Sequence, residues 1–186
     1  GHAGFMCVGA FSSAIFSLLT DGMMPDALRF ILALIIGIAV SALFGLLIGI
    51  PVLRLNGDYL AIVTLAFGEI IKNILNSIYL GVDSNGVHCS FVSQMALNMQ
   101  PDGKMLINGA MGVTGTPHDA NFTVSVVILL ISLFIVQNLI DSRDGRAIMS
   151  IRDNRIAAES TGINITKYKM TGFVVSASIA GAAGVL

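Results

Sequence analysis

Four stretches of this chain, each long enough to cross most or all of a lipid bilayer, contain no charged residue. They run over His2 to Thr20, Phe30 to Leu53, Phe122 to Ile140 and Met170 to Leu186. At a rise of about 1.5 Å per residue, a helix over each stretch approaches the ~30 Å thickness of the hydrocarbon layer. A fifth stretch, Tyr59 to Leu80, is as long and apolar but contains Glu69 and Lys72. The sequence therefore predicts about five membrane helices.

The overall composition agrees with this pattern. The chain is 55% hydrophobic and 11% charged, and its mean hydropathy is +0.85. Soluble domains have about 45–50% apolar and about 25% charged residues. We expect an all-α, polytopic membrane bundle that forms a single transmembrane domain over residues 1–186. Because there is no initiator Met and the last apolar run has only 17 residues, we expect the domain to be truncated at both ends.

The positive charges indicate which loops face the cytoplasm. Six of the ten Lys and Arg residues lie between Arg143 and Lys169. If the helices cross alternately, Arg54 lies on the same side, and only Arg29 and Lys104 lie on the other. Cytoplasmic loops are the richer in Lys and Arg. Residues 141–169 are therefore predicted to be cytoplasmic. Residues 81–120, which are rich in Gly, Pro, Asn, Asp and Ser and have no helical period, are predicted to form an external loop.

Small residues recur at every fourth position in two of the predicted helices, which favours close helix packing. The two ridges are Gly37, Ser41, Gly45 and Gly49 in one helix, and Gly172, Ser176, Ala180 and Gly184 in the other.

Glu69 is the only acidic residue deep inside an apolar stretch. An ionised group at the centre of a membrane helix costs about 3 kcal/mol, so Glu69 should face protein or water. Two interpretations remain open. Lys72 lies three residues on and could form an internal ion pair with Glu69, or Glu69 could line a polar translocation path together with Tyr59 and Thr64.

The basic loop contains the pattern of a short surface helix. Asp153 or Asn154 can cap its N-terminus, and Gly162 suits the left-handed conformation that ends a helix. Such a helix has about two turns. The alternative is an ordinary basic cytoplasmic loop.

Several kinds of site have no support. Gly103 and Lys104 are followed by Met105, so there is no phosphate-binding loop, and no metalloprotease or hydrolase motif occurs. Cys7 and Cys89 do not have the spacing of a metal site. We predict no catalytic residue, no metal, no cofactor and no nucleic-acid partner.

Four segments have distinctive sequences: Gly1 to Phe11, Gly57 to Ile71, Arg146 to Asn164 and Phe173 to Gly184. The second reads Gly-Asp-Tyr-Leu-Ala-Ile-Val-Thr-Leu-Ala-Phe-Gly-Glu-Ile-Ile. These segments, in this order, resemble the LivM family of branched-chain amino-acid ABC permeases. The resemblance spans nearly the whole chain. Gly112 to Pro117 is only weakly similar to a Gly-rich family segment.

The resemblance assigns a role to the basic loop. Ala157, Ala158 and Gly162 fall on the motif through which ABC importers couple to their ATPases, Glu-Ala-Ala followed by Gly after three residues. Here Ile156 replaces the Glu. The residues that the resemblance implies for ATPase coupling are Arg152, Asp153, Arg155, Ala157, Ala158, Glu159 and Gly162.

The resemblance also implies partners. A second homologous permease subunit would share the pathway, two cytoplasmic ATPase subunits would hydrolyse ATP, and an external substrate-binding protein would deliver leucine, isoleucine or valine. The chain itself would be a non-catalytic subunit in the bacterial inner membrane. Alternatives are the same machine with urea or a sugar as cargo, an ion-coupled secondary transporter, and a membrane scaffold that transports nothing.

Overall fold

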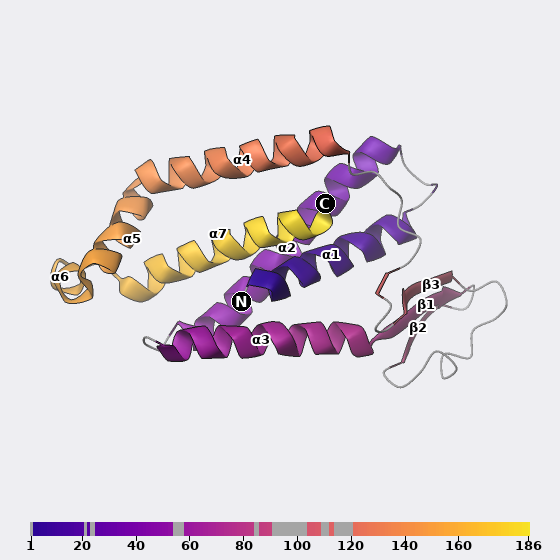
Figure 1. The fold of residues 1–186 in the computed structure, drawn as a ribbon, viewed down its shortest axis with the longest axis horizontal. Coiled ribbons are helices and arrows are strands. Elements are labelled where there is room, and N and C mark those ends of the chain that lie inside the picture. Colours follow the sequence, from indigo (N-terminus) through magenta and orange to yellow (C-terminus); the bar gives the residue numbers. More distant parts are fainter. Residues whose placement is uncertain are drawn as a thin grey trace.

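A computed structural model describes residues 2–20, 22, 25–53, 58–83, 86–90, 104–108, 112–113 and 121–186. Long helices make up most of this part of the chain (Figure 1). The elements in chain order are α1 (His2–Leu19), α2 (Asp26–Val52), α3 (Asp58–Ser77), β1 (Tyr79–Asp83), β2 (Gly86–Ser90), β3 (Lys104–Asn108), α4 (Phe122–Asp141), α5 (Arg143–Asp153), α6 (Arg155–Ser160) and α7 (Ile165–Val185).

The predicted helical membrane bundle is confirmed. Among the described residues, α1, α2, α3 and α4 are long and apolar enough to cross a membrane. The fifth predicted helix, α7, has 21 residues but is not one of these four candidate spans, and its first five residues include Lys167 and Lys169. At 27 residues, α2 has a length of about 40 Å, which exceeds the hydrocarbon layer and favours a tilt.

Helices α1, α2 and α7 pack most closely, and α3 flanks α1. Their backbones touch at glycines: a Cβ atom on Gly9 of α1 would collide with the backbone of Gly181 in α7. A Cβ atom on Gly45 of α2 would lie 2.7 Å from the Cβ atom of Ala177. Close approach of this kind gives membrane helices the dispersion contacts that hold them together.

The predicted ridge on α2 is confirmed, since Gly37, Ser41, Gly45 and Gly49 are all buried. The predicted ridge on α7 is confirmed in part, since a Cβ atom on Gly184 would collide with the carbonyl of Met6 in α1 and Ala180 packs against the apolar core, but the most deeply buried row lies one position further on. The buried residues of that helix are Ala177 and Gly181, one residue after Ser176 and Ala180. The period of four was correct, but it could not distinguish two neighbouring rows of small residues.

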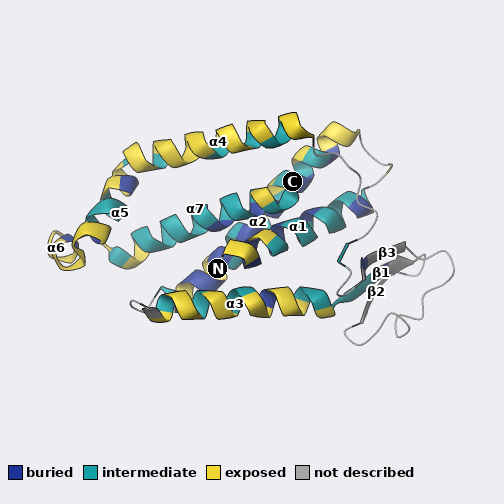
Figure 2. Ribbon diagram, in the orientation of Figure 1, coloured by how far each residue is buried: buried dark blue, intermediate teal, exposed yellow. Residues whose placement is uncertain are grey.

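A small apolar core lies where these helices meet α3. It consists of Phe5, Val8, Ile48, Val52, Ile71 and Ala177. The ring of Phe5 packs edge-to-face on that of Phe173, with centroids 5.6 Å apart. Figure 2 shows that buried residues lie mainly in α1 and α2, that α7 is mostly half-buried, and that α4 has no buried residue.

A three-stranded antiparallel sheet of order β2-β1-β3 follows α3. Most of it lies in the segment predicted to be an irregular loop, residues 81–120, of which 84–85, 91–103, 109–111 and 114–120 lie outside the described residues. Ile107 of β3 is 2% exposed and shares a second apolar cluster with Leu18 of α1. The sheet therefore rests on the end of α1.

Candidate functional site

Two short helices join α4 to α7 at one end of the bundle (Figure 1). The first, α5, begins where the Ser142 hydroxyl accepts a hydrogen bond from the backbone N–H of Gly145 over 3.0 Å. A Cβ atom on Gly145 would collide with the carbonyl of Leu139, so the corner between α4 and α5 requires glycine there. The sequence interpretation expected no helix over residues 143–153.

The second short helix, α6, is capped by hydrogen bonds at both ends. The side-chain oxygen of Asn154 accepts a hydrogen bond from the N–H of Ala157 over 3.1 Å. At the other end, the backbone N–H of Ile163 donates a hydrogen bond to the carbonyl of Ala158 over 3.1 Å. The backbone N–H of Gly162 donates one to the carbonyl of Glu159 over 3.0 Å. Gly162 has φ +84°, as the left-handed residue of such a motif requires. The predicted capping roles of Asn154 and Gly162 are confirmed.

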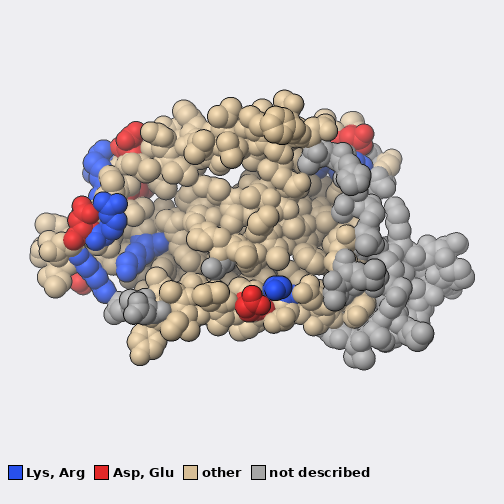
Figure 3. All heavy atoms as spheres, in the orientation of Figure 1, with Lys and Arg blue, Asp and Glu red and all other residues tan. Residues whose placement is uncertain are grey.

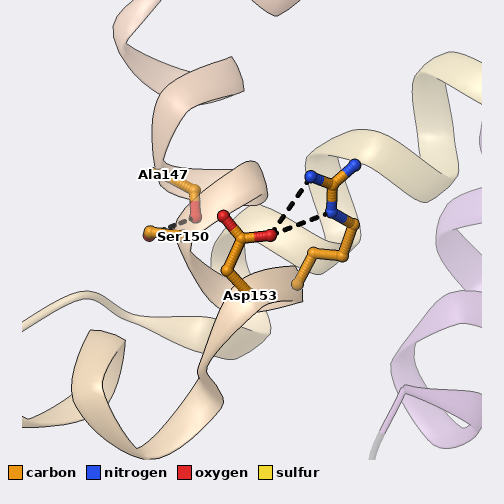
Figure 4. Close-up of polar contacts among 4 residues, drawn as sticks. Ala147, Ser150 and Asp153 are labelled. Atoms are coloured by element: carbon orange, nitrogen blue, oxygen red, sulfur yellow. Dashed lines mark hydrogen bonds and ion pairs between the residues drawn. The ribbon is translucent and has the colours of Figure 1, made fainter.

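Asp153, the other candidate cap, has a different role. It is the last residue of α5, and its Oδ1 atom accepts hydrogen bonds from Nε and Nη2 of Arg152 over 3.2 and 3.1 Å (Figure 4). Both side chains are exposed, so this ion pair contributes little to stability. The last turn of α5 is also held by Ser150, whose hydroxyl donates to the carbonyl of Ala147 (Figure 4).

The structure brings the predicted coupling residues together at this end of the molecule. Six are exposed: Arg152, Asp153, Arg155, Ala157, Glu159 and Gly162. Ala158 is the exception, at 3% exposure. Ile156, where the family motif has Glu, is 81% exposed. Figure 3 shows charged side chains gathered around α5 and α6, whereas the visible faces of α4 and α3 are mostly uncharged.

The three candidate path residues of α3 lie on two different faces of that helix. The Glu69 carboxylate and the Lys72 ammonium are 3.7 Å apart, with side-chain exposures of 61% and 55%. The ion pair inferred from their spacing therefore forms, and it lies on the exposed face. Tyr59 is also exposed, at 72%, whereas Thr64 is partly buried and faces α1 and α7.

Thr64 lines a small pocket of about 70 Å³ between α1, α3 and α7. The other lining residues are His2, Phe5, Phe173, Ser176 and Ala177. His2 Nε2 and Ser176 Oγ are 2.7 Å apart and share a hydrogen bond. Within the described ranges, no group of three or more His, Cys, Asp or Glu side chains is arranged to hold a metal ion.

Sequence reasoning did not place His2 or Ser176 in a polar site. The signal available was a lone histidine in an apolar stretch, which is uncommon in membrane helices. Its partner could not be identified, because the two residues are 174 positions apart.

Comparisons with known proteins agree over the full chain. Residues 1–186 match the family model described as "Branched-chain amino acid transport system / permease component". The chain is 35% and 34% identical to the high-affinity branched-chain amino acid transport system permease proteins LivM of Salmonella typhimurium and Escherichia coli. It is 26% identical to the nucleoside ABC transporter permease protein NupC of Lactococcus lactis. No solved structure matches.

These matches cover all of this chain but only part of each relative. The matched region is 44% of either LivM protein and 56% of the nucleoside permease. The chain thus spans about half the length of the curated relatives it matches.

Proposed function

Since this chain belongs to the family of branched-chain amino acid permease components, we propose that it forms part of the membrane path of an ATP-driven importer of leucine, isoleucine and valine. It is a multi-pass protein of the bacterial inner membrane. In this proposal the chain is not catalytic, and ATP hydrolysis takes place in two cytoplasmic ATPase subunits. An external binding protein delivers the substrate, and a second homologous permease subunit completes the path.

The observation that carries the proposal is the geometry of α6. A helix of six residues is too short to be stable in water by itself, yet this one is capped at both ends and stands at the charged end of the bundle. Its exposed Ile156 has no partner within the described part of the chain that would account for an isoleucine in water. A groove on an ATPase surface would bury it. The charged residues around it, Arg152, Asp153, Arg155 and Glu159, would then border the contact.

The exposed ion pair of α3 supports a second membrane subunit. Glu69 is near the middle of the candidate span Tyr59–Ser77, where a charge in contact with lipid is unfavourable by about 3 kcal/mol. Contact with another subunit or with water removes most of that cost. We therefore propose that the face of α3 carrying Tyr59 and Glu69 borders the path between the two permease subunits.

Branched-chain amino acids are the preferred cargo because the two relatives above 30% identity are both described as branched-chain amino acid permeases. Nucleosides are the second candidate, favoured by the resemblance to the nucleoside permease at 26% identity. Leucine and uridine therefore make a suitable pair of test substrates.

The experiment is uptake by proteoliposomes that contain the full-length protein with its neighbouring subunits. ATP is placed inside, the binding protein outside, and no ion gradient is applied. We expect leucine uptake that requires both ATP and the binding protein. Uridine uptake in place of leucine uptake would move the cargo to nucleosides, and uptake driven by an ion gradient alone would overturn the proposal.

A matched pair of variants tests the coupling role of α6. Gly162→Lys introduces a bulky charge and backbone strain at the end of α6, whereas Gly22→Lys introduces the same change at another glycine of positive φ, +80°, between α1 and α2. Neither glycine has an atom near the position of a Cβ. We expect Gly162→Lys to assemble but to hydrolyse ATP without transport, and Gly22→Lys to transport. Equal transport by both variants would contradict the role of α6.

A further inference from the structure

Helix α4 is set apart from the other membrane helices. Among the described residues its only extensive contact is with α5, whereas α1, α2 and α7 pack on one another. Figure 1 shows α4 joined to α7 through α5 and α6 at one end of the molecule. It is also one of the four helices that are long and apolar enough to cross a membrane. A candidate membrane span therefore lies beside the bundle without packing on it.

The short helix α5 holds α4 in this position. At the corner between the two helices, a Cβ atom on Gly145 would collide with the carbonyl of Leu139. Further along α5, the Ile151 side chain is 8% exposed, and Cδ1 of Ile148 would lie 3.7 Å from a Cβ atom on Gly172 of α7. Thus α5 is tightly joined to α4 at its start and packs on α7 from its middle onward. The separation between α4 and α7 is a fixed feature of the fold.

The length of α5 bears on the size of the space beside α4. Its 11 residues make a helix about 16 Å long, and Figure 1 shows it crossing from the end of α4 toward the start of α7. Helices that pack directly on each other have axes about 8–10 Å apart. An α-helix with its side chains is about 10 Å in diameter. A brace of this length thus suits two helices that have a third one between them.

One face of α4 is shielded although no helix packs closely on it. Its opposite face has large side chains that are more than half exposed, among them Leu130, Leu133 and Phe134 at 57%, 56% and 67%. Since each residue turns a helix by about 100°, the half-buried positions lie within a single stripe about 100° wide. This stripe, the inner face of α4, consists of Val124, Ser125, Ile128, Ser132 and Leu139.

The lengths of the relatives indicate what can occupy this space. The matched region is 44% of either LivM protein, so more than half of each relative lies outside it. A membrane span needs only about 20 residues. The space is bounded by α4, α5 and α7 of one chain, so a helix of the same polypeptide can occupy it as the protein folds. A separate subunit would have to enter between helices that α5 already joins.

We infer that a membrane helix from the part of the full-length protein outside residues 1–186 lies between α4 and α7 and packs on the inner face of α4. The contacting surface of that helix is apolar, because the stretch Phe122 to Ile140 has no charged residue that could pair with one. The outer face of α4 is left to lipid. This inference concerns the assembly of one subunit, so it does not depend on the proposed cargo.

A photoreactive group on each face of α4 identifies what covers that face. A benzophenone maleimide is attached to Ile128→Cys in an otherwise cysteine-free full-length protein, assembled with its partner subunits in liposomes. Leu130→Cys is the matched control, because two residues turn a helix by about 200° and so reach the outer face. Mass spectrometry then identifies the adducts formed on irradiation. We expect Ile128→Cys to link to an apolar peptide of the same polypeptide outside residues 1–186, and Leu130→Cys to link to phospholipid.

A second pair of variants and a second measurement make the test independent of any one substitution. Ser132→Cys and Phe134→Cys repeat the comparison about one turn further along α4. A spin label at each of the four positions reports the rate of collision with oxygen, which dissolves in the acyl chains of the bilayer. With the full-length permease alone in liposomes, we expect the rates at Ile128 and Ser132 to be several times lower than those at Leu130 and Phe134.

Two results would overturn the inference. The first is an equal collision rate on both faces, together with phospholipid adducts at all four positions, because lipid would then cover the inner face. The second is an inner-face adduct to another subunit, or a low collision rate there that appears only when the second permease subunit is added. None of these measurements requires transport, so a failure of the proposed cargo would leave this test unaffected.

Discussion

Ser41 of α2 donates its hydroxyl hydrogen to the backbone carbonyl oxygen of Phe5 in α1 over 3.0 Å. The Ser41 side chain has no exposure to solvent, and it also touches Gly181 of α7. One polar group thus lies at the point where three helices meet. In a bilayer, a hydrogen bond between helices of this kind contributes about 0.6–2 kcal/mol.

We expect Ser41→Ala to lower the stability of the bundle by about 1 kcal/mol, because the hydrogen bond to Phe5 is lost without a change of shape. Thermal unfolding in detergent measures the effect. Ser132→Ala on α4 is the control, since that hydroxyl bonds only within its own helix, to the carbonyl of Leu129 over 2.8 Å. Equal melting temperatures for the two variants would contradict the structural role of Ser41.

Gly181→Ala is expected to destabilise the protein by about 1–3 kcal/mol, because the added methyl group must displace Ser41 or the backbone of α2. Gly172→Ala, on the same helix, should be neutral or slightly stabilising. The nearest atom that its methyl group would meet is Cδ1 of Ile148, at 3.7 Å. The two variants carry the same chemical change, so the difference between their free energies of unfolding in detergent measures the effect of the closer packing at Gly181.

Asn154→Ala is expected to loosen α6 without unfolding the bundle. Without the hydrogen bond from the N–H of Ala157 to the Asn154 side chain, the stability of this short helix should fall by about 0.5–2 kcal/mol. Hydrogen exchange of the α6 amides should accelerate by about two- to thirtyfold, while exchange in α2 stays unchanged. Asn154→Ser should retain most of the protection, since serine caps a helix nearly as well.

The ion pair between Glu69 and Lys72 on α3 leads to a prediction about membrane insertion. Glu69→Gln leaves the Lys72 ammonium without its partner in the middle of a candidate span, so we expect less protein to insert into the membrane. Exchange of the two charges, Glu69→Lys with Lys72→Glu, should restore insertion if the pair is structural. Restored insertion with transport still lost would show instead that the path requires the carboxylate at position 69.

Ile156→Lys is expected to weaken binding of the ATPase while leaving the permease folded. The side chain is 81% exposed, so the free energy of unfolding should change by less than about 0.5 kcal/mol. An anchor residue that fills a pocket contributes about 2 kcal/mol, or about thirtyfold in affinity. Affinity measured with purified ATPase subunits tests this, and Ile156→Leu should bind normally.

The membrane helices could be predicted from the sequence because lipid imposes a strict rule on charge. The rule fixes the apolar stretch and not the helix ends. Helix α2 begins at Asp26 and α7 at Ile165, earlier than the apolar runs at Phe30 and Met170. The early turns contain Arg29, Lys167 and Lys169, which are tolerated where a helix leaves the hydrocarbon layer.

The ends of α6 could be predicted because caps depend on neighbours within a few residues. The helix α5 was missed, since its polar residues resemble those of a loop. The three strands were missed because each has only five residues, and because β1 begins inside the apolar stretch Tyr59 to Leu80 that predicted a helix. The assignment of residues 81–120 to the outside and 141–169 to the cytoplasm stays a prediction.

The pocket could not be predicted, because it depends on which faces of three helices meet. The sequence placed Tyr59, Thr64 and Glu69 together, whereas helix geometry turns Thr64 toward α1 and α7 and the other two away. The predicted path residues thus belong to two surfaces. The contact of His2 with Ser176 follows only from the crossing of α1 and α7.

The glycine contacts of α7 have a mechanical consequence. Only residues 161–164 separate α6 from α7, and Asn164 caps α7 by accepting from the N–H of Lys167 over 3.1 Å. Further along, α7 meets α1 through backbone atoms at Gly181 and Gly184, with no long side chain between them that could change rotamer and absorb a shift. An axial displacement that begins at α6 would therefore be transmitted along α7 to α1 with little loss, because the small residues of α7 place the two backbones in direct contact.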